Sequence, residues 1–306
     1  MTRLPIRLLI LLLFSWINAP ASDQPTQILH PPPLISADPA AGLRVRATAP
    51  EYAGTAVHHS ICLPADWQPG RQYPVMVEYT GNHYPAAGSS GEVAGASLGF
   101  GLSAGRLIWV VLPFVAADAR SNARTWWGDE QATVAYAKTN IPRICARFGG
   151  DPARVFLCGF SRGAIAVNYI GLNDDQIARL WRGFITHDHY DGQRAWPNTT
   201  WGTPLEAYRH DARTRLARLA NRPVLVMQAE STKPIQDYLS KAPHPGQFSF
   251  LDVPMQAYFR TLPHNTIIHH HNDQWLLYNL PAATQARDWL QKQAELPAAR
   301  PSPELR

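Results

Sequence analysis

Short apolar runs recur along the chain, and stretches with helical periodicity separate them. Such runs are typical of strands buried on both faces of a parallel sheet that helices cover. Right-handed crossovers leave few alternatives, so the sequence predicts an α/β fold with a mostly parallel central sheet of about eight strands flanked by helices. Pro142 falls inside one predicted helix and is expected to kink or split it. The expected strands span residues 43–49, 56–63, 73–81, 106–114, 154–158, 182–192, 222–230 and 246–255, and the clearest helices span 129–148, 162–172 and 282–296.

The first 21 residues do not fit this pattern. Arg3 and Arg7 precede an apolar run, and Ala19, Pro20 and Ala21 follow it as a site for cleavage. We therefore expect residues 1–21 to be a secretory signal peptide, which predicts a secreted or periplasmic protein. The apolar run is too short to hold the chain in a bilayer, so no membrane anchor is expected.

The remaining chain divides into one domain with a tail at each end. Residues 22–42 are proline-rich and lack a period, which predicts a flexible lead-in. Residues 297–306 have the same character and are expected to be disordered, which leaves residues 43–296 as the domain. The chain carries 28 Lys and Arg against 23 Asp and Glu, a net charge of +5. The basic residues are scattered, so nucleic acid is not expected as a partner.

One serine stands between two glycines where a strand is expected to become a helix. The stretch RVFLCGFSRGAIAVNYIG, residues 154–171, contains Gly159, Ser161 and Gly163. A sharp strand–helix turn leaves no room for side chains two residues before and after its centre. The pattern predicts a nucleophile elbow that holds the Ser161 hydroxyl above the carboxyl edge of the sheet.

A serine hydroxyl needs a base within hydrogen-bonding reach. In folds that carry such an elbow, the base follows the last strand of the sheet. The sequence there contains four histidines, and we predict that His271 is the base because a helix cap follows it. His269 is the alternative, since alternation would place it on the same side. The other two are His264 and His270.

A carboxylate is expected to orient the base, and it should follow one of the central strands. Glu230 lies at the carboxyl end of the expected strand 222–230, so we predict that it is this acid. Asp188 and Asp191 follow the preceding strand and remain alternatives, as does Asp237 in the next helix.

An oxyanion needs hydrogen-bond donors that are already in place. The backbone N–H of Arg162 directly follows the predicted nucleophile. The second donor should come from the loop after the strand 73–79, and by position we predict the N–H of Asn82. Gly81 allows the backbone of this loop to approach a substrate closely.

The chain resembles the α/β-hydrolase superfamily over about residues 43–296, and secreted esterases related to polyhydroxybutyrate depolymerases and feruloyl esterases in particular. The resemblance rests on YPVMVEYTGN, RTWWGDEQATVAYAK, GGDPARVFLCGFSRGA and HNDQW. It implies that Ser161 is the nucleophile and His271 the base. Thr232 stands where these enzymes commonly have an aspartate after the acid strand, so the resemblance leaves the acid open. Arg162 is unusual inside the elbow, and we expect it to meet an anionic group of a substrate.

Aromatic residues gather in loops on the predicted carboxyl side of the sheet. Trp126, Trp127 and Tyr84 are the predicted substrate-binding residues, because aromatic rings suit sugars and aryl esters. The alternative is that Trp126 and Trp127 only cover the core. Further aromatic residues in loops on this side are Tyr79, Tyr190, Trp196 and Trp201.

The cysteines and histidines point to neither disulfides nor a metal. Cys62, Cys145 and Cys158 are an odd number, and we expect buried thiols in preference to a Cys145–Cys158 bridge. The runs HDH (187–189) and HHH (269–271) contain metal-ligand residue types, but neither matches the helical spacing of zinc hydrolases. No metal and no cofactor is therefore predicted.

These observations together predict a secreted serine hydrolase. It would cleave carboxylic esters through an acyl-enzyme, on carbohydrate-linked acetyl or feruloyl esters or on short polyesters. The alternatives are a non-catalytic secreted protein that binds glycans on the same scaffold and a serine peptidase. Residues 186–222 are long enough to form a lid.

Overall fold

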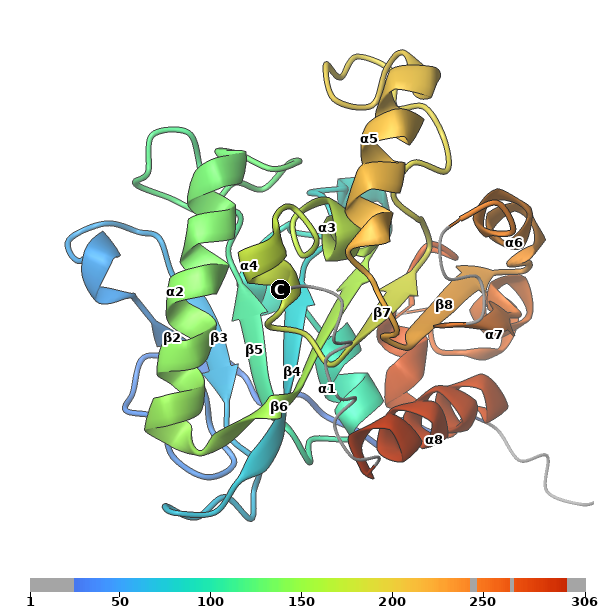
Figure 1. Cartoon of the computed structure of the whole chain (residues 1–306). Helices are drawn as coiled ribbons and strands as arrows, with labels where there is room; N and C mark the ends of the chain where they lie inside the picture. The colour runs from blue at the N-terminus through green and yellow to red at the C-terminus, as the bar shows by residue number, and fades with distance from the viewer. Residues whose placement is uncertain (1–24, 243–246, 265–266, 296–306) are drawn as a thin grey trace, which may run out of the picture.

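A computed structural model of the chain describes residues 25–242, 247–264 and 267–295, and in this part of the chain nine strands form one mixed sheet. The strand order is β1-β2-β3-β5-β4-β6-β7-β8-β9 (Figure 1). The strands from β5 to β9 are parallel to one another, whereas β3 is antiparallel to both β2 and β5. The predicted signal peptide and tail lie outside the described residues.

The elements follow the predicted alternation of strands and helices. The strands are β1 (Leu34–Ile35), β2 (Arg44–Ala47), β3 (His59–Cys62), β4 (Tyr73–Tyr79), β5 (Ile108–Leu112), β6 (Gly150–Phe160), β7 (Gly183–His187), β8 (Val224–Ala229) and β9 (Phe248–Val253). The α-helices are α1 (Leu98–Ser103), α2 (Glu130–Phe148), α3 (Arg162–Tyr169), α4 (Asp175–Ala178), α5 (Leu205–Ala217), α6 (Lys233–Leu239), α7 (Met255–Thr261) and α8 (Pro281–Glu295). Short 3₁₀-helices span η1 (Pro50–Tyr52), η2 (Pro85–Ala87), η3 (Val93–Gly95) and η5 (Gln274–Leu277).

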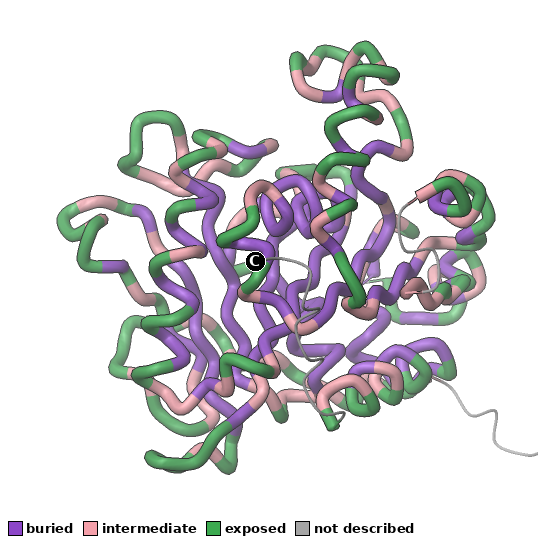
Figure 2. The backbone as a smooth tube through the Cα atoms, in the orientation of Figure 1, coloured by how far each residue is buried: buried purple, intermediate pink, exposed green. Residues whose placement is uncertain are grey.

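Helices cover both faces of the sheet, because successive side chains of a strand point to opposite faces. In β4, Val75 and Val77 belong to the apolar cluster beneath α2, α3, α4 and α5. Met76 belongs to the second cluster, beneath α1, α7 and α8. The central strands are therefore buried along their length, while the outer sides of the helices are exposed (Figure 2).

One sequence-based expectation about the chain's course is wrong, and one of the two alternatives for Pro142 is excluded. Residues 26–42 are not a flexible lead-in: β1 pairs with β2, and the N–H groups of Ile28 and Leu29 donate to Leu277 O at 2.9 and 3.1 Å. A proline-rich segment can pair at the edge of a sheet because an edge strand needs only a few backbone hydrogen bonds. Pro142 does not split its helix, since α2 continues through it. The alternative that it kinks the helix stays a prediction.

The described residues also answer the questions about cysteines and membrane segments. All three cysteines are free and buried, so the Cys145–Cys158 bridge is not formed. None of the described helices is long and apolar enough to cross a membrane. The carboxyl ends of β4, β6, β7 and β8 meet along one edge of the sheet, and Ser161 and Asp188 directly follow two of these strands.

Candidate active site

Ser161 lies in the tight turn between β6 and α3. Its backbone has φ 57° and ψ −119°, a conformation that is strained for a residue with a side chain. A Cβ atom at Gly159 would overlap the backbone of Gly163, and one at Gly163 would overlap the Tyr79 carbonyl. Only glycine fits at either position. The turn is therefore the strand–elbow–helix arrangement that the sequence predicted.

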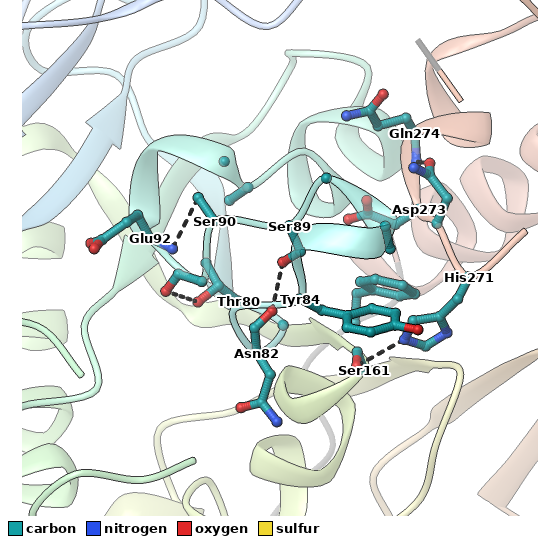
Figure 3. Close-up of a pocket in the computed structure, with 18 of the residues that line it drawn as sticks. Thr80, Asn82, Tyr84, Ser89, Ser90, Glu92, Ser161, His271, Asp273 and Gln274 are labelled. Carbon is teal, nitrogen blue, oxygen red and sulfur yellow. Dashed lines mark hydrogen bonds between the residues drawn. The ribbon is translucent and has the colours of Figure 1, made fainter. Parts of the chain in front are cut away.

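The Ser161 hydroxyl meets the imidazole of His271. Ser161 Oγ lies 2.9 Å from His271 Nε2 (Figure 3). Asn272 Oδ1 accepts from the N–H of Gln274, the first residue of η5, at 2.6 Å. His269 has a supporting place, because its Nδ1 accepts the backbone N–H of His271 at 2.9 Å.

The carboxylate beside His271 is that of Asp188, directly after β7. Asp188 Oδ2 lies 3.1 Å from His271 Nδ1. Asp188 Oδ1 accepts the N–H of Ala229 at 2.6 Å and the side-chain amide of Gln228 at 3.1 Å, so the end of β8 holds this carboxylate in place. Asp188 was one of the three alternatives that the sequence left open.

The prediction that Glu230 orients the base is therefore corrected. Glu230 is exposed, and its Oε1 accepts the N–H of Gln256 at 2.6 Å at the start of α7. The other two candidates are also engaged elsewhere. Asp191 forms a buried ion pair with Arg215 at 2.8 Å, and Asp237 pairs with Lys233 on the surface of α6.

Asp188 is held as a carboxylate although it is buried. Burial by itself raises the pKa of an acid. Here the charge of His187, the hydrogen bond and charge of His271, and the N–H of Ala229 outweigh burial and lower the pKa of Asp188 to about 2. The Asp188 carboxylate can therefore accept a hydrogen bond from the Nδ1–H of His271. The other ring nitrogen, Nε2, then carries no proton and faces Ser161 as an acceptor.

Two backbone N–H groups are free to bind an oxyanion beside Ser161. Among the hydrogen bonds of the described residues, neither Asn82 N–H nor Arg162 N–H has a protein acceptor. Gly81 brings the first of these groups close, because a Cβ atom built on it would lie 3.4 Å from Ser161 Cβ. These are the two donors that the sequence predicted, and the structure leaves both of them available.

A small cavity opens beside Ser161 and His271. Its volume is about 60 Å³, and residues of the segments 78–96, 160–161 and 271–274 line it. Tyr84 is 43% exposed and points toward the Ser161–His271 pair (Figure 3). Exposed Ile268 lies close by, since a Cβ atom on Gly88 would be 3.0 Å from its Cδ1. The rim is thus partly apolar.

Three acidic residues, Glu78, Glu92 and Asp273, line the same cavity. Glu78 Oε2 accepts from Gly99 N–H and from the Trp109 indole N–H, both at 2.8 Å. Burial raises the pKa of Glu78 to about 7, and the nearby charge of Asp273 acts in the same direction. The two hydrogen bonds and the charge of Arg44 oppose that shift without cancelling it.

The predicted aromatic platform is corrected at both tryptophans. Trp127 is 5% exposed and stacks on Tyr169 at 4.6 Å, so it belongs to the core. Trp126 packs edge-on against Trp196 and Trp201 at 5.3 and 4.9 Å, and neither Trp126 nor Trp127 lines the cavity. Of the three predicted substrate-binding residues, only Tyr84 does. Tyr79 and Tyr190 are buried as well.

The expectation that Arg162 meets an anionic group of a substrate is also wrong. Its side chain is 1% exposed and points into the protein, where it donates to backbone carbonyls and stacks over Phe114. Sequence reasoning missed this role and that of His269. The position of Arg162 inside the elbow was the available signal for its role, because a side chain there is either buried or faces the substrate.

The histidine runs do not form a metal centre in this part of the molecule. Within residues 25–242, 247–264 and 267–295, no three His, Cys, Asp or Glu side chains come together as metal ligands. His187 is buried and its Nε2 accepts from the Trp275 indole at 2.9 Å. His271, in the second run, faces Ser161 and Asp188.

No family model matches the sequence, and no curated protein matches it. Solved structures do match the fold. The AtxE2 isopeptidase superimposes with a TM-score of 0.55 at 15% identity, over 85% of this chain and 41% of its own, so this chain spans less than half of that protein. The carboxylesterase Cest-2923 from Lactobacillus plantarum WCFS1 superimposes with a TM-score of 0.52 at 16% identity, over 84% of this chain and 100% of its own. With the parallel strand order and the serine elbow, these likenesses confirm the predicted fold class: the chain has the α/β-hydrolase fold.

Proposed function

We propose that the chain is a serine hydrolase that cleaves carboxylic esters through an acyl-enzyme. One observation carries the proposal: contacts of 2.9 and 3.1 Å join His271 to Ser161 and to Asp188, and Ser161 lies on a strained turn beside two free backbone N–H groups. This is the arrangement that activates a serine hydroxyl and stabilises the charge that its attack creates.

The steps follow from the positions of these atoms. His271 Nε2 takes the proton of Ser161 Oγ as the oxygen attacks the ester carbonyl. Asp188 holds the His271 Nδ1–H and stabilises the imidazolium that forms. The N–H groups of Asn82 and Arg162 bind the carbonyl oxygen as it becomes negative. His271 then gives its proton to the leaving alcohol, and a water molecule releases the acyl group by the reverse sequence.

The size and rim of the cavity favour a short acyl group. About 60 Å³ accommodates an acetyl group better than the long, planar feruloyl group. The exposed faces of Tyr84 and Ile268 at the rim suit the ring of a sugar alcohol. We therefore propose acetyl esters of carbohydrates as the substrate class. Export through the segment 1–21 is part of the same proposal.

Labelling by a fluorophosphonate probe tests the proposal. The folded protein should be labelled covalently, and Ser161→Ala should abolish labelling, whereas Ser240→Ala on the surface near α6 should not. A panel of sugar and aryl esters of increasing acyl length should be hydrolysed best at two carbons. Absence of labelling in the folded protein would instead support the glycan-binding alternative, and labelling that survives Ser161→Ala would reject the assigned nucleophile.

A further inference from the structure

The side chain of Arg162 is buried beside the predicted oxyanion site, and all of its N–H groups find acceptors. Nε donates to Thr80 O at 3.3 Å. Nη1 donates to Trp126 O at 2.8 Å and Ala123 O at 3.3 Å. Nη2 donates to Gly81 O at 2.9 Å, Thr80 Oγ1 at 3.1 Å and Gly91 O at 3.2 Å. One guanidinium thus joins the loop after β4 to the segment before α2.

The charge of Arg162 is balanced by carbonyl dipoles. Among the described residues, no ion pair forms with its guanidinium, and Glu92, whose charge acts on the pKa of Arg162, pairs instead with Arg124 at 3.2 Å. The guanidinium lies 4.0 Å from the centre of the Phe114 ring. A buried arginine of this kind is held rigidly, because its planar fork fixes the direction of every carbonyl that it binds.

The contact with Gly81 bears directly on the oxyanion donor. Gly81 C=O and Asn82 N–H belong to the same planar peptide group and point in opposite directions. When Arg162 draws the carbonyl of Gly81 inward, the N–H of Asn82 must face the other way, on the side of the cavity and Ser161. Asn82 is fixed at its side chain too, since Asn82 Oδ1 accepts Trp126 N–H at 2.8 Å.

These contacts close a ring of hydrogen bonds. Arg162 binds the carbonyls of Gly81 and Trp126, and Trp126 binds the side chain of Asn82. The Asn82 side chain points away from Ser161 (Figure 3), and its Oδ1 accepts the Trp126 N–H of this ring. Trp126, which the sequence suggested as a substrate platform, therefore acts through its backbone in this network.

We propose that the Arg162 side chain is a positioning residue, which holds the Gly81–Asn82 peptide so that its N–H is preorganised to bind the oxyanion. The inference rests on the proposed serine hydrolase function. One residue then serves the oxyanion site twice, with its own N–H as one donor and its side chain aligning the other.

Arg162→Lys tests the inference, because lysine keeps the charge but has one flexible donor group in place of the fork. Misaligning one oxyanion donor should lower kcat on the order of 100-fold, with KM unchanged. Affinity for a boronic acid, which forms a tetrahedral adduct with serine, should fall by a similar factor. Affinity for the unreactive amide analogue of the substrate should stay the same.

Arg222→Lys is the matched control. Like Arg162, Arg222 donates to several backbone carbonyls, here those of Ala178, Arg218, Leu219 and Trp181, and lies over an aromatic ring, 5.2 Å from the Phe184 ring centre. Arg222 does not line the cavity. If Arg162 has only a structural role, both variants should lose thermal stability while kcat and boronate affinity are kept. That result, in a folded Arg162→Lys protein, would overturn the inference.

Thr80→Val keeps the inference testable if Arg162→Lys does not fold. It removes a single acceptor of the network, the Thr80 hydroxyl, and should lower kcat and boronate affinity together, on the order of fivefold. Unchanged kcat in this variant would then count against the inference. Failure of the proposed function itself is recognised separately, because the wild-type protein would not be labelled by the fluorophosphonate.

Discussion

A carboxylate follows each of the strands β7 and β8, but the two carboxylates have different roles. Each of these neighbouring parallel strands is followed by a carboxylate with positive φ: Asp188 at 56° and Glu230 at 62°. Asp188 is 2% exposed and contacts His271, whereas Glu230 is exposed and binds the N–H of Gln256. The two carboxylates thus differ in what packs over them, and not in their position relative to a strand.

This difference shows that the backbone around a carboxylate, and not its place after a strand, decides which carboxylate contacts the base. Ala229 N–H, at the very end of β8, reaches back to Asp188 Oδ1. The end of β8 therefore supports the carboxylate that follows β7, and its own carboxylate lies beyond that support. The segment with His271 then passes over Asp188.

Isosteric amides should separate the two carboxylates most strongly. Asp188→Asn removes the charge and presents an N–H to the imidazole, so kcat for ester hydrolysis should fall about 10³- to 10⁴-fold. Glu230→Gln should leave kcat unchanged, because Glu230 does not contact His271. Steady-state kinetics on an acetyl ester, with circular dichroism to verify folding, measures both. The comparison breaks if the loss occurs in Glu230→Gln.

Glu78 extends the comparison to a third carboxylate at the same edge. Like Asp188 it is almost fully buried, at 1% exposure. The neighbouring imidazoles of His187 and His271 lower the pKa of Asp188 to about 2, whereas burial and the charge of Asp273 raise the pKa of Glu78 to about 7. Burial alone therefore does not decide the charge of an acid at this site.

The raised pKa of Glu78 predicts a pH-dependent stability. Between its ordinary pKa of 4.5 and about 7, the folded chain keeps a proton that the unfolded chain has lost. The stability that this group contributes is complete below pH 4.5 and is lost as the pH rises through 7, by on the order of 3 kcal/mol. Asp188 acts oppositely, since its contribution is lost only as the pH falls toward 2.

Urea unfolding of Glu78→Gln at pH 4.5 and pH 8 measures this contribution. Glutamine can still accept from Gly99 and Trp109, so the variant should fold and should lose less stability than the wild type between the two pH values. Glu295→Gln on the surface of α8 is the control and should behave as the wild type does. Equal pH dependence in Glu78→Gln and the wild type would mean that Glu78 is not the group responsible.

The fold and the nucleophile can be predicted from the sequence more reliably than the acid that orients the base. Apolar runs and the two glycines around Ser161 are local signals, because steric limits act within a few residues. Whether Asp188 or Glu230 contacts the base depends on a hydrogen bond between the ends of β7 and β8. Its partners, Asp188 and Ala229, are 41 positions apart in the sequence. No spacing rule encodes such a contact.

The aromatic residues and the lead-in were misjudged for a related physical reason. A tryptophan in a loop can cover the core or face a ligand, and its hydrophobicity is the same in both cases. Trp127 became core because Tyr169 and Trp201 offer it a stack and an edge contact. The segment 26–42 is held by hydrogen bonds to Leu277 and by the pairing of β1 with β2. Leu277 lies far away in the sequence, and the pairing with β2 requires a formed sheet.

The smallest expected effect concerns what Glu230 does in place of catalysis. Its carboxylate binds the N–H of Gln256 in the first turn of α7, where a negative charge and an acceptor both stabilise a helix. Glu230→Ala should therefore lower the free energy of unfolding by up to about 1 kcal/mol. Because Glu230 does not contact His271, kcat should be unchanged. Glu230→Gln keeps an acceptor oxygen and should lose less stability than Glu230→Ala in the same urea titration. Should Glu230→Ala reduce kcat without lowering stability, the two strand ends would be linked in catalysis, and the division of roles between β7 and β8 would have to be abandoned.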